Sequence, residues 1–202
     1  MKAILSRYGF WGSIRLLINL LYTKLFFPRA KIIRLPFDIR NKKNIQIGKG
    51  FITGTGCRLE AYPEENRDKK VLVIGRHVEI NDYVHITCAA SVIINDDVLI
   101  ASKVYISDIN HGNYSGNGLH DSPESIPSKR KNIGKPVFID EKVWIGESAC
   151  ILPGSRIGKG CIIGAMSLVN SEIPPYSIAV GVPAKVIKQY NFQTKHWEKV
   201  LS

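Results

Sequence analysis

Aliphatic residues recur at every sixth position between Val137 and Val169. An α-helix would place apolar residues three and four positions apart, and a half-buried strand would alternate them with polar residues. The six-residue period fits neither, and it is typical of a β-helix built from repeats. Three hexads would form one triangular coil of eighteen residues, and stacked coils would bury their aliphatic side chains in one column. Ile145 should then lie directly beneath Ile163. The repeating positions are Ile139, Ile145, Ile151, Ile157, Ile163 and Val169.

The same period runs through two earlier triplets of isoleucines, with an excess of two residues between them. The triplets are Ile74, Ile80 and Ile86, followed by Ile94, Ile100 and Ile106. We interpret the excess as a small bulge at a corner of the coil. The period then disappears over residues 107–136. A segment of this length without repeats inside a compact repeat domain is commonly a functional loop.

Length and composition fit a single repeat domain with short appendages. The chain has 202 residues, 45% of them hydrophobic, so it can bury a substantial core. We expect an N-terminal helical segment at residues 1–35, the β-helix at 36–190 with its inserted loop at 107–136, and a C-terminal tail at 191–202. The cysteines are expected to be core thiols without disulfide partners. They are Cys57, Cys88, Cys150 and Cys161.

Positive charge is concentrated at the N-terminal end. Residues 1–49 contain eleven Lys or Arg and the single acid Asp38, while the whole chain has a net charge of +11. A helix is expected from Ile4 to Phe27, because Pro28 would end it. Such a basic, aromatic-rich helix could lie in a membrane interface or cap the open end of the coils, and the sequence leaves both interpretations open.

The first residues do not have the pattern of a cleaved signal peptide, and charged residues interrupt their apolar stretch. We therefore expect a cytoplasmic protein, with peripheral contact to the inner membrane surface if the helix binds lipid. Nucleic acid is not expected as a partner. The basic residues are scattered among aliphatic ones, and no recognition motif accompanies them.

Several spaced motifs in the C-terminal half resemble those of the hexapeptide-repeat O-acetyltransferases, which include the galactoside and maltose acetyltransferases. They are Val143–Trp144–Ile145–Gly146, the segment ILPGSRIG at 151–158, IGAMS at 163–167, IPP at 173–175 and GVPAK at 181–185. The resemblance spans about residues 45–190, and segments 80–86, 100–104 and 107–112 look most similar to O-acetyltransferases of lipopolysaccharide O-antigen. It implies an all-β, left-handed parallel β-helix, acetyl-CoA as the cosubstrate, no metal, and a homotrimer whose active sites lie between subunits.

The chemistry of such an enzyme requires a base, because a sugar hydroxyl must lose its proton as it attacks a thioester. Histidine is suited to this task near neutral pH. His111 stands at the start of the inserted loop, where the family places its catalytic histidine, so we predict that it is the general base. Asp108 or a backbone carbonyl could hold its ring in the correct tautomer.

Two residues are candidates for binding the acceptor. The resemblance implies this role for Asn81, whose amide can both donate to and accept from sugar hydroxyls, although a simple turn residue at a corner is an equal alternative. His85 should project outward from the coil nearby. Ala89 occupies a position where the galactoside enzymes have an acidic sugar contact, so a different acceptor is expected.

The donor site can be placed on one edge of the coils. Glu147 and Ala165 should lie one coil apart, as should Gly146 and Gly164, with about 4.8 Å between the members of each pair, and small residues there expose the backbone to a pantetheine arm. The resemblance implies that Ala165 binds this arm through its backbone. Trp144 could pack against the thioester end or be a buried structural residue. Lys185 and Lys188 match basic positions that meet the nucleotide phosphates in the family, although a solvated C-terminal stretch is an equal alternative.

These observations predict an O-acetyltransferase that acts on a sugar of an O-antigen or another cell-surface polysaccharide unit, either lipid-linked or free. Two alternatives remain, namely an N-acetyltransferase for an amino sugar nucleotide and a non-catalytic scaffold that binds glycans. A zinc enzyme on the same fold would need three convergent histidines. The spacing of His77, His85 and His111 does not predict such a cluster.

Overall fold

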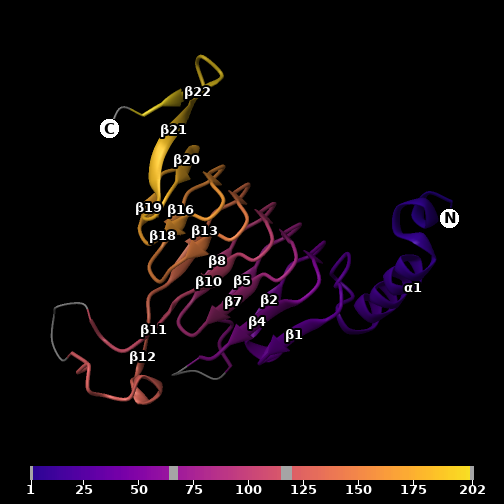
Figure 1. Cartoon of the computed structure of the whole chain (residues 1–202), viewed down its shortest axis with the longest axis horizontal. Coiled ribbons are helices and arrows are strands. Elements are labelled where there is room, and N and C mark those ends of the chain that lie inside the picture. The colour runs from indigo at the N-terminus through magenta and orange to yellow at the C-terminus, as the bar shows by residue number, and fades with distance from the viewer. Residues whose placement is uncertain (1, 64–67, 115–119, 201–202) are drawn as a thin grey trace.

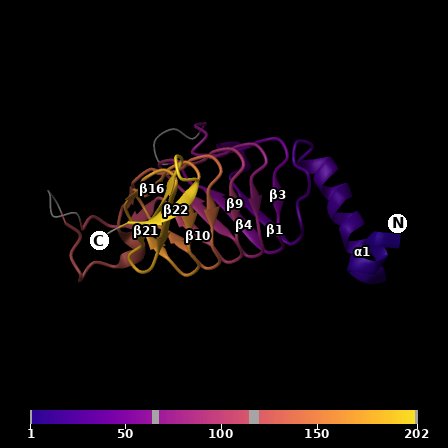
Figure 2. The same cartoon turned by 90° about the horizontal axis from the view of Figure 1, so that it is seen from above.

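The computed structural model of the protein describes residues 2–63, 68–114 and 120–200, with side chains from residue 5 onward. Helix α1 (Lys2–Phe26) lies at one end, the strands form stacked coils, and the C-terminal strands lie at the opposite end (Figures 1 and 2). Within these described residues, no helix is both long and apolar enough to cross a bilayer.

The coils form a parallel β-helix with three sheets, and the chain visits the first, second and third sheet in turn. The first sheet contains β1 (Phe37–Arg40), β4 (Cys57–Ala61), β7 (His85–Cys88), β10 (Tyr105–Ser107), β15 (Cys150–Ile151) and β18 (Leu168–Val169). The second contains β2 (Ile45–Ile47), β5 (Leu72–Ile74), β8 (Val92–Ile94), β13 (Val137–Ile139), β16 (Arg156–Ile157) and β19 (Glu172–Ile173). The third contains β3 (Ile52–Thr53), β6 (Glu79–Ile80), β9 (Leu99–Ile100), β14 (Trp144–Ile145), β17 (Ile162–Ile163), β20 (Ser177–Val180), β21 (Lys185–Asn191) and β22 (His196–Lys199).

The predicted register of the coils is confirmed. Ile145 pairs with Ile163 in the next coil and with Ile100 in the preceding one, and all three side chains are fully buried. Burial of one such side chain contributes about 1.5–3 kcal/mol. Gly146 follows this column, and a Cβ there would lie 2.5 Å from the backbone nitrogen of Ala165. Glycine is therefore required at this close approach of the two coils.

The irregular segments gather at one corner, between the first and second sheets. The extra residues predicted between Ile86 and Ile94 lie there, in the connection 89–91 from β7 to β8. The inserted loop leaves from the same corner one coil later, between β10 and β13. It contains β11 (Ile109–His111), the short 3-10 helix η2 (Pro127–Lys129) and β12 (Asn132–Gly134), with β11 and β12 antiparallel.

Helix α1 ends at Phe26, close to the predicted boundary before Pro28, and bends at Gly9, where φ is 65°. The residues after the helix, Phe27 and Ile33, join the hydrophobic core, with Tyr22 packed against it. They lead into β1, and the 3-10 helix η1 (Lys42–Asn44) precedes β2.

The C-terminal strands were not predicted from the sequence. β21 turns back antiparallel to β20, and β22 pairs antiparallel with β21. The tail expected at residues 191–202 therefore includes a strand that extends the third sheet.

Candidate active site

The inserted loop places His111 at the end of β11, with its side chain exposed. Its backbone carbonyl accepts a hydrogen bond from the Tyr114 hydroxyl at 2.6 Å. Arg130 donates to the same hydroxyl at 2.6 Å, and its guanidinium also donates to the Ser125 hydroxyl at 2.8 Å and to the Ser125 carbonyl at 2.7 Å. Arg130 thus joins distant parts of the loop and fixes the backbone of His111.

Gly112 allows the chain to turn directly after His111. Its φ is 106°, a backbone conformation that residues with a Cβ rarely adopt. A Cβ at this position would also lie 2.4 Å from the Tyr114 hydroxyl oxygen. The Gly112 amide donates to the carbonyl of Lys131 at 2.9 Å, which closes the two sides of the loop.

Asp108 anchors the start of the loop to the bulge in the preceding coil. Its fully buried carboxylate accepts hydrogen bonds from the backbone N–H groups of Ala89, Ala90 and Ser91 at 2.6 to 2.8 Å. It also accepts a hydrogen bond from the Cys88 thiol at 3.4 Å. Burial and this carboxylate raise the pKa of the Cys88 thiol, which therefore stays protonated and can donate. All of these hydrogen bonds go to residues 88–91 and none to the His111 ring, so within this subunit the Asp108 carboxylate does not hold that ring, and any influence on His111 would act through the position of β11. The other sequence-based suggestion, a backbone carbonyl as the ring partner, stays a prediction.

Five of the candidate residues lie at two opposite edges of the first sheet. Its coil strands are parallel, so residues that precede them share one edge and residues that follow them share the other. Asn81, Gly146 and Ala165 precede strands of this sheet, whereas Asp108 and His111 follow one. The fold therefore brings Asn81 to the predicted donor edge and leaves His111 at the other edge of the same subunit.

The predicted donor residues line the third sheet and its corner with the first. Trp144 pairs with Ile162, Ile162 with Ile178, and Ile178 with Lys188, so Trp144 and Lys188 occupy one row. Three strand spacings separate them, which is about 14 Å. Lys185 pairs with Val180 on the side toward the corner, and the Trp144 side chain is 49% exposed.

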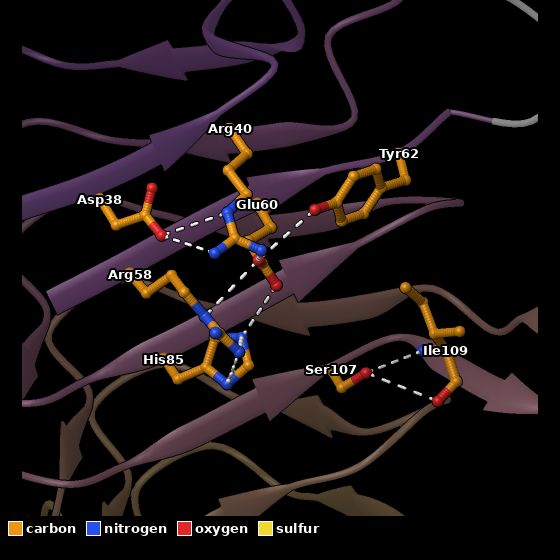
Figure 3. Close-up of polar contacts among 8 residues, drawn as sticks. All are labelled: Asp38, Arg40, Arg58, Glu60, Tyr62, His85, Ser107 and Ile109. Carbon is orange, nitrogen blue, oxygen red and sulfur yellow. Dashed lines mark hydrogen bonds and ion pairs between the residues drawn. The ribbon is translucent and has the colours of Figure 1, made fainter.

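His85 projects from the middle of the first sheet into a network of charged side chains that the sequence did not predict (Figure 3). Its Nε2 lies 3.1 Å from a carboxylate oxygen of Glu60, whose side chain is only 7% exposed. Arg58 lies within 3.4 Å of the ring nitrogens, and Arg40 pairs with Glu60 at 2.7 Å. If Nε2–H donates to Glu60, Nδ1 is the acceptor for Arg58. These contacts hold the ring within the network, and the role of His85 in acceptor binding stays a prediction.

Glu60 was missed because the hexad pattern identifies only inward aliphatic positions. It directly follows the buried Leu59 and lies two residues after Arg58. This alternation of charged and apolar residues is the sequence pattern from which Glu60 could have been identified. The exposed Arg40 guanidinium has a raised pKa, mainly because of its hydrogen bond to Tyr62 and, second, that to Asp38. It therefore stays fully charged in this network.

The histidines considered for zinc have separate surroundings. His77 lies 3.2 Å from Asp97, His85 contacts Glu60, and His111 lies on the inserted loop. Over residues 2–63, 68–114 and 120–200, no three His, Cys, Asp or Glu side chains gather in the manner of metal ligands.

Comparison with known proteins identifies the family. Residues 136–171 match the family model described as bacterial transferase hexapeptide (six repeats). The chain is 43% identical over 194 residues, 96% of each chain, to an Escherichia coli protein named putative lipopolysaccharide biosynthesis O-acetyl transferase WbbJ.

Two solved structures extend this similarity. One is a variant of AntD, an N-acyltransferase from Bacillus cereus, in complex with dTDP-4-amino-4,6-dideoxyglucose and coenzyme A. It has a TM-score of 0.66 and 25% identity, over 86% of this chain and 90% of that chain. The other is a hexapeptide-repeat acetyltransferase from Vibrio cholerae with acetyl-coenzyme A, which has a TM-score of 0.54 and 25% identity, over 75% and 74% of the two chains. Identity to WbbJ over nearly the whole of both chains, together with the confirmed left-handed parallel β-helix, shows that this protein belongs to the hexapeptide-repeat acetyltransferase family.

Proposed function

We propose that this protein transfers the acetyl group of acetyl-CoA to a sugar hydroxyl of an O-antigen or another cell-surface polysaccharide unit. The observation that carries the proposal is the 43% identity, over 96% of both chains, to a protein named as an O-acetyl transferase of lipopolysaccharide biosynthesis. The exposed His111 on an internally bonded loop adds a residue able to perform the proton transfer.

In this reaction the acetyl-CoA thioester supplies the acetyl group. His111 accepts the proton of the sugar hydroxyl as the hydroxyl oxygen forms its bond to the acetyl carbon. The carbon–sulfur bond breaks, and the proton then passes from the imidazole to the departing thiolate. The products are the sugar acetate and coenzyme A, and His111 returns to its neutral form.

The donor would lie along the edge that contains Gly146 and Ala165. Backbone amides at this edge suit the amides of a pantetheine arm, and the exposed indole of Trp144 offers an apolar face. Lys185 and Lys188, both on β21, would meet the phosphates. The row from Trp144 to Lys188 suits an elongated molecule that crosses several strands.

We also propose a homotrimer with composite sites. His111 and the donor edge belong to opposite edges of the first sheet, so a site made from one subunit would have to span that sheet. In a closed ring of three subunits, the loop edge of one subunit can face the donor edge of the next. Each site would then take His111 from one chain and Gly146, Ala165 and Trp144 from its neighbour. Asn81 would contact the acceptor from the donor side.

A second candidate is N-acetylation of an amino sugar nucleotide. The chain is similar to AntD, an N-acyltransferase solved with a nucleotide-linked amino sugar, and this similarity supports the second candidate. The two candidates share the donor and the base, and differ in the acceptor atom.

The test is acetyl transfer by the wild type and by His111→Ala, measured as coenzyme A release with a panel of lipid-linked glycans, free glycans and amino sugar nucleotides. Removal of a general base should lower kcat by about 10²- to 10⁴-fold. His120→Ala, in the same loop, is the matched control and should retain activity. NMR of the product would identify the acetylated atom.

Equal rates for His111→Ala and the wild type would show that His111 is not the base. Transfer only to amines would replace the O-acetyltransferase proposal with the second candidate. Absence of transfer to every acceptor, with acetyl-CoA still bound, would favour the glycan-binding scaffold.

A further inference from the structure

Helix α1 packs on the coils through its polar side. Asn19 and Thr23 are both buried. The Asn19 side-chain oxygen accepts from the Leu35 amide at 3.1 Å, and the Thr23 hydroxyl accepts from the Ile33 amide at 2.7 Å. Arg15 adds a bond from its guanidinium to the Leu35 carbonyl at 2.9 Å. A helix on a globular surface normally buries its apolar side, so this arrangement is inverted.

The opposite side of α1 carries a continuous apolar stripe. Beyond the bend at Gly9 the helix turns about 100° per residue, which places seven exposed apolar side chains within an arc of about 120°. Their exposed fractions range from 37% to 79%, with Trp11 the most exposed. These residues are Phe10, Trp11, Ile14, Leu17, Ile18, Leu21 and Leu25. An apolar surface of this kind marks a site of interaction.

The charge on this end of the molecule indicates what the stripe contacts. Helix α1 contains four Lys or Arg and no Asp or Glu. Figures 1 and 2 show that it projects from the N-terminal end of the coils, away from the C-terminal strands. A second copy of α1 on the stripe would bring together two helices that carry only positive charge, which repel each other. A surface with negative charge supplies the counter-charge.

A basic pocket of about 510 Å³ adjoins the C-terminal end of α1. Its lining combines apolar side chains such as Phe26 and Ile47 with four basic residues. The basic residues are Arg29, Lys42, Lys43 and Lys70. Lys42 Nζ donates to the Phe26 carbonyl at 2.9 Å and lies 4.1 Å from the centre of the Phe27 ring. Among the described residues, the exposed Asp68 lies 3.6 Å from Lys43 Nζ. Basic groups beside apolar surface suit phosphate headgroups attached to acyl chains.

We propose that α1 and this pocket bind the surface of a membrane rich in anionic phospholipid. The apolar stripe enters the boundary between headgroups and acyl chains, and the basic side chains lie against lipid phosphates. The helix lies in the interface and does not span it, in agreement with its charge and hydropathy. This proposal is independent of the acetyl-transfer reaction.

The experiment is flotation of the full chain with vesicles of phosphatidylglycerol and phosphatidylethanolamine, and with vesicles of phosphatidylcholine alone. The wild type should float with the anionic vesicles, less so at high salt. Leu17→Gln/Leu21→Gln/Leu25→Gln should reduce the recovered fraction at least tenfold. Leu20→Gln is the matched control, because Leu20 is also exposed but lies outside the stripe. It should float like the wild type.

A second pair of variants tests the charge. Arg29→Glu/Lys43→Glu should weaken recovery with anionic vesicles several-fold, whereas Lys195→Glu/Lys199→Glu, the same charge change in the C-terminal hairpin, should not. If the triple variant fails to fold, quenching by brominated lipid serves instead. The quenched part of the wild-type fluorescence should be lost in Trp11→Phe.

Three results would overturn the proposal. The first is failure of the wild type to float with anionic vesicles, and the second is equal flotation of the folded triple variant. The third is a smaller assembly for the folded triple variant in sedimentation velocity, which would make the stripe a contact between subunits.

Discussion

At the residue scale, two buried carboxylates hold the polar surroundings of the candidate site. Glu60 organises Arg40, Arg58 and His85 on the first sheet, and Asp108 holds the bulge at residues 89–91. Such groups tolerate burial because charge-assisted hydrogen bonds replace the water that they lose. Removal of a carboxylate should therefore cost far more here than at the surface.

Asp108→Asn tests this. The amide would turn an N–H toward backbone N–H groups and leave at least one of them without an acceptor. We expect a loss of about 1–3 kcal/mol in the free energy of unfolding, measured by urea denaturation at fixed protein concentration. We also expect a lower kcat with little change in KM for acetyl-CoA, because β11 carries His111. Asp97→Asn, at a half-exposed carboxylate paired with His77, should change stability by less than about 0.5 kcal/mol. Equal stability of the wild type and Asp108→Asn would contradict the anchoring role.

The sequence pointed to Asp108 through its spacing from His111 but did not reveal its partners. Its hydrogen bonds reach residues 89–91, which lie one coil earlier, in the connection that contains the two-residue excess. Sequence spacing reports neighbours along the chain, and these contacts form only when coils stack. For the same reason, the sequence did not reveal the contact between Glu60 and His85, which lie on paired strands of neighbouring coils.

At the element scale, the period predicted the coils well because each aliphatic position is dictated by one repeated burial environment. Ile139, Ile145 and Ile151 each pair with the residue eighteen positions later, as the six-residue period predicts. Segments outside the column carry no such constraint. β21 and β22 form a hairpin whose exposed and half-buried residues lack the hexad pattern. The inserted loop likewise takes its form from specific polar contacts, chiefly those of Arg130.

Arg130→Ala should therefore loosen the inserted loop and leave the coils intact. Loss of its bonds to Tyr114 and Ser125 removes one of the links between the two sides of the loop. We expect faster amide hydrogen exchange in residues 109–114 and 122–134, measured by mass spectrometry, with unchanged protection of β14 and β17. The kcat should fall by about 10- to 100-fold if His111 is the base, because a misplaced catalytic group is costly. Lys129→Ala is the control at the neighbouring basic residue. Unchanged exchange in the loop of Arg130→Ala would show that other contacts fix it.

At the scale of the whole molecule, the two edges of the first sheet differ in structure. One edge has tight corners with Gly146 and Ala165, where neighbouring coils approach closely. The other edge tolerates the bulge at 89–91 and the inserted loop, because these connections lie outside the buried column, and longer surface connections cost little. In the proposed homotrimer, a single subunit would present half of each of two sites, and the ring would complete them.

Mixing two inactive variants tests the composite site. His111→Ala removes the proposed base, and Ala165→Trp blocks the proposed donor edge with a bulky side chain at an exposed position, so each homotrimer should be inactive. In trimers formed at random from equal amounts of both, a site between subunits has an intact His111 in one chain and an intact donor edge in the next in about one quarter of cases. Co-expression should therefore restore about 25% of wild-type acetyl transfer, and sedimentation should give three times the chain mass of 22.6 kDa. A mixture of separately folded trimers that cannot exchange subunits is the control and should stay inactive. No recovery in verified mixed trimers would place His111 and the donor edge in the same chain.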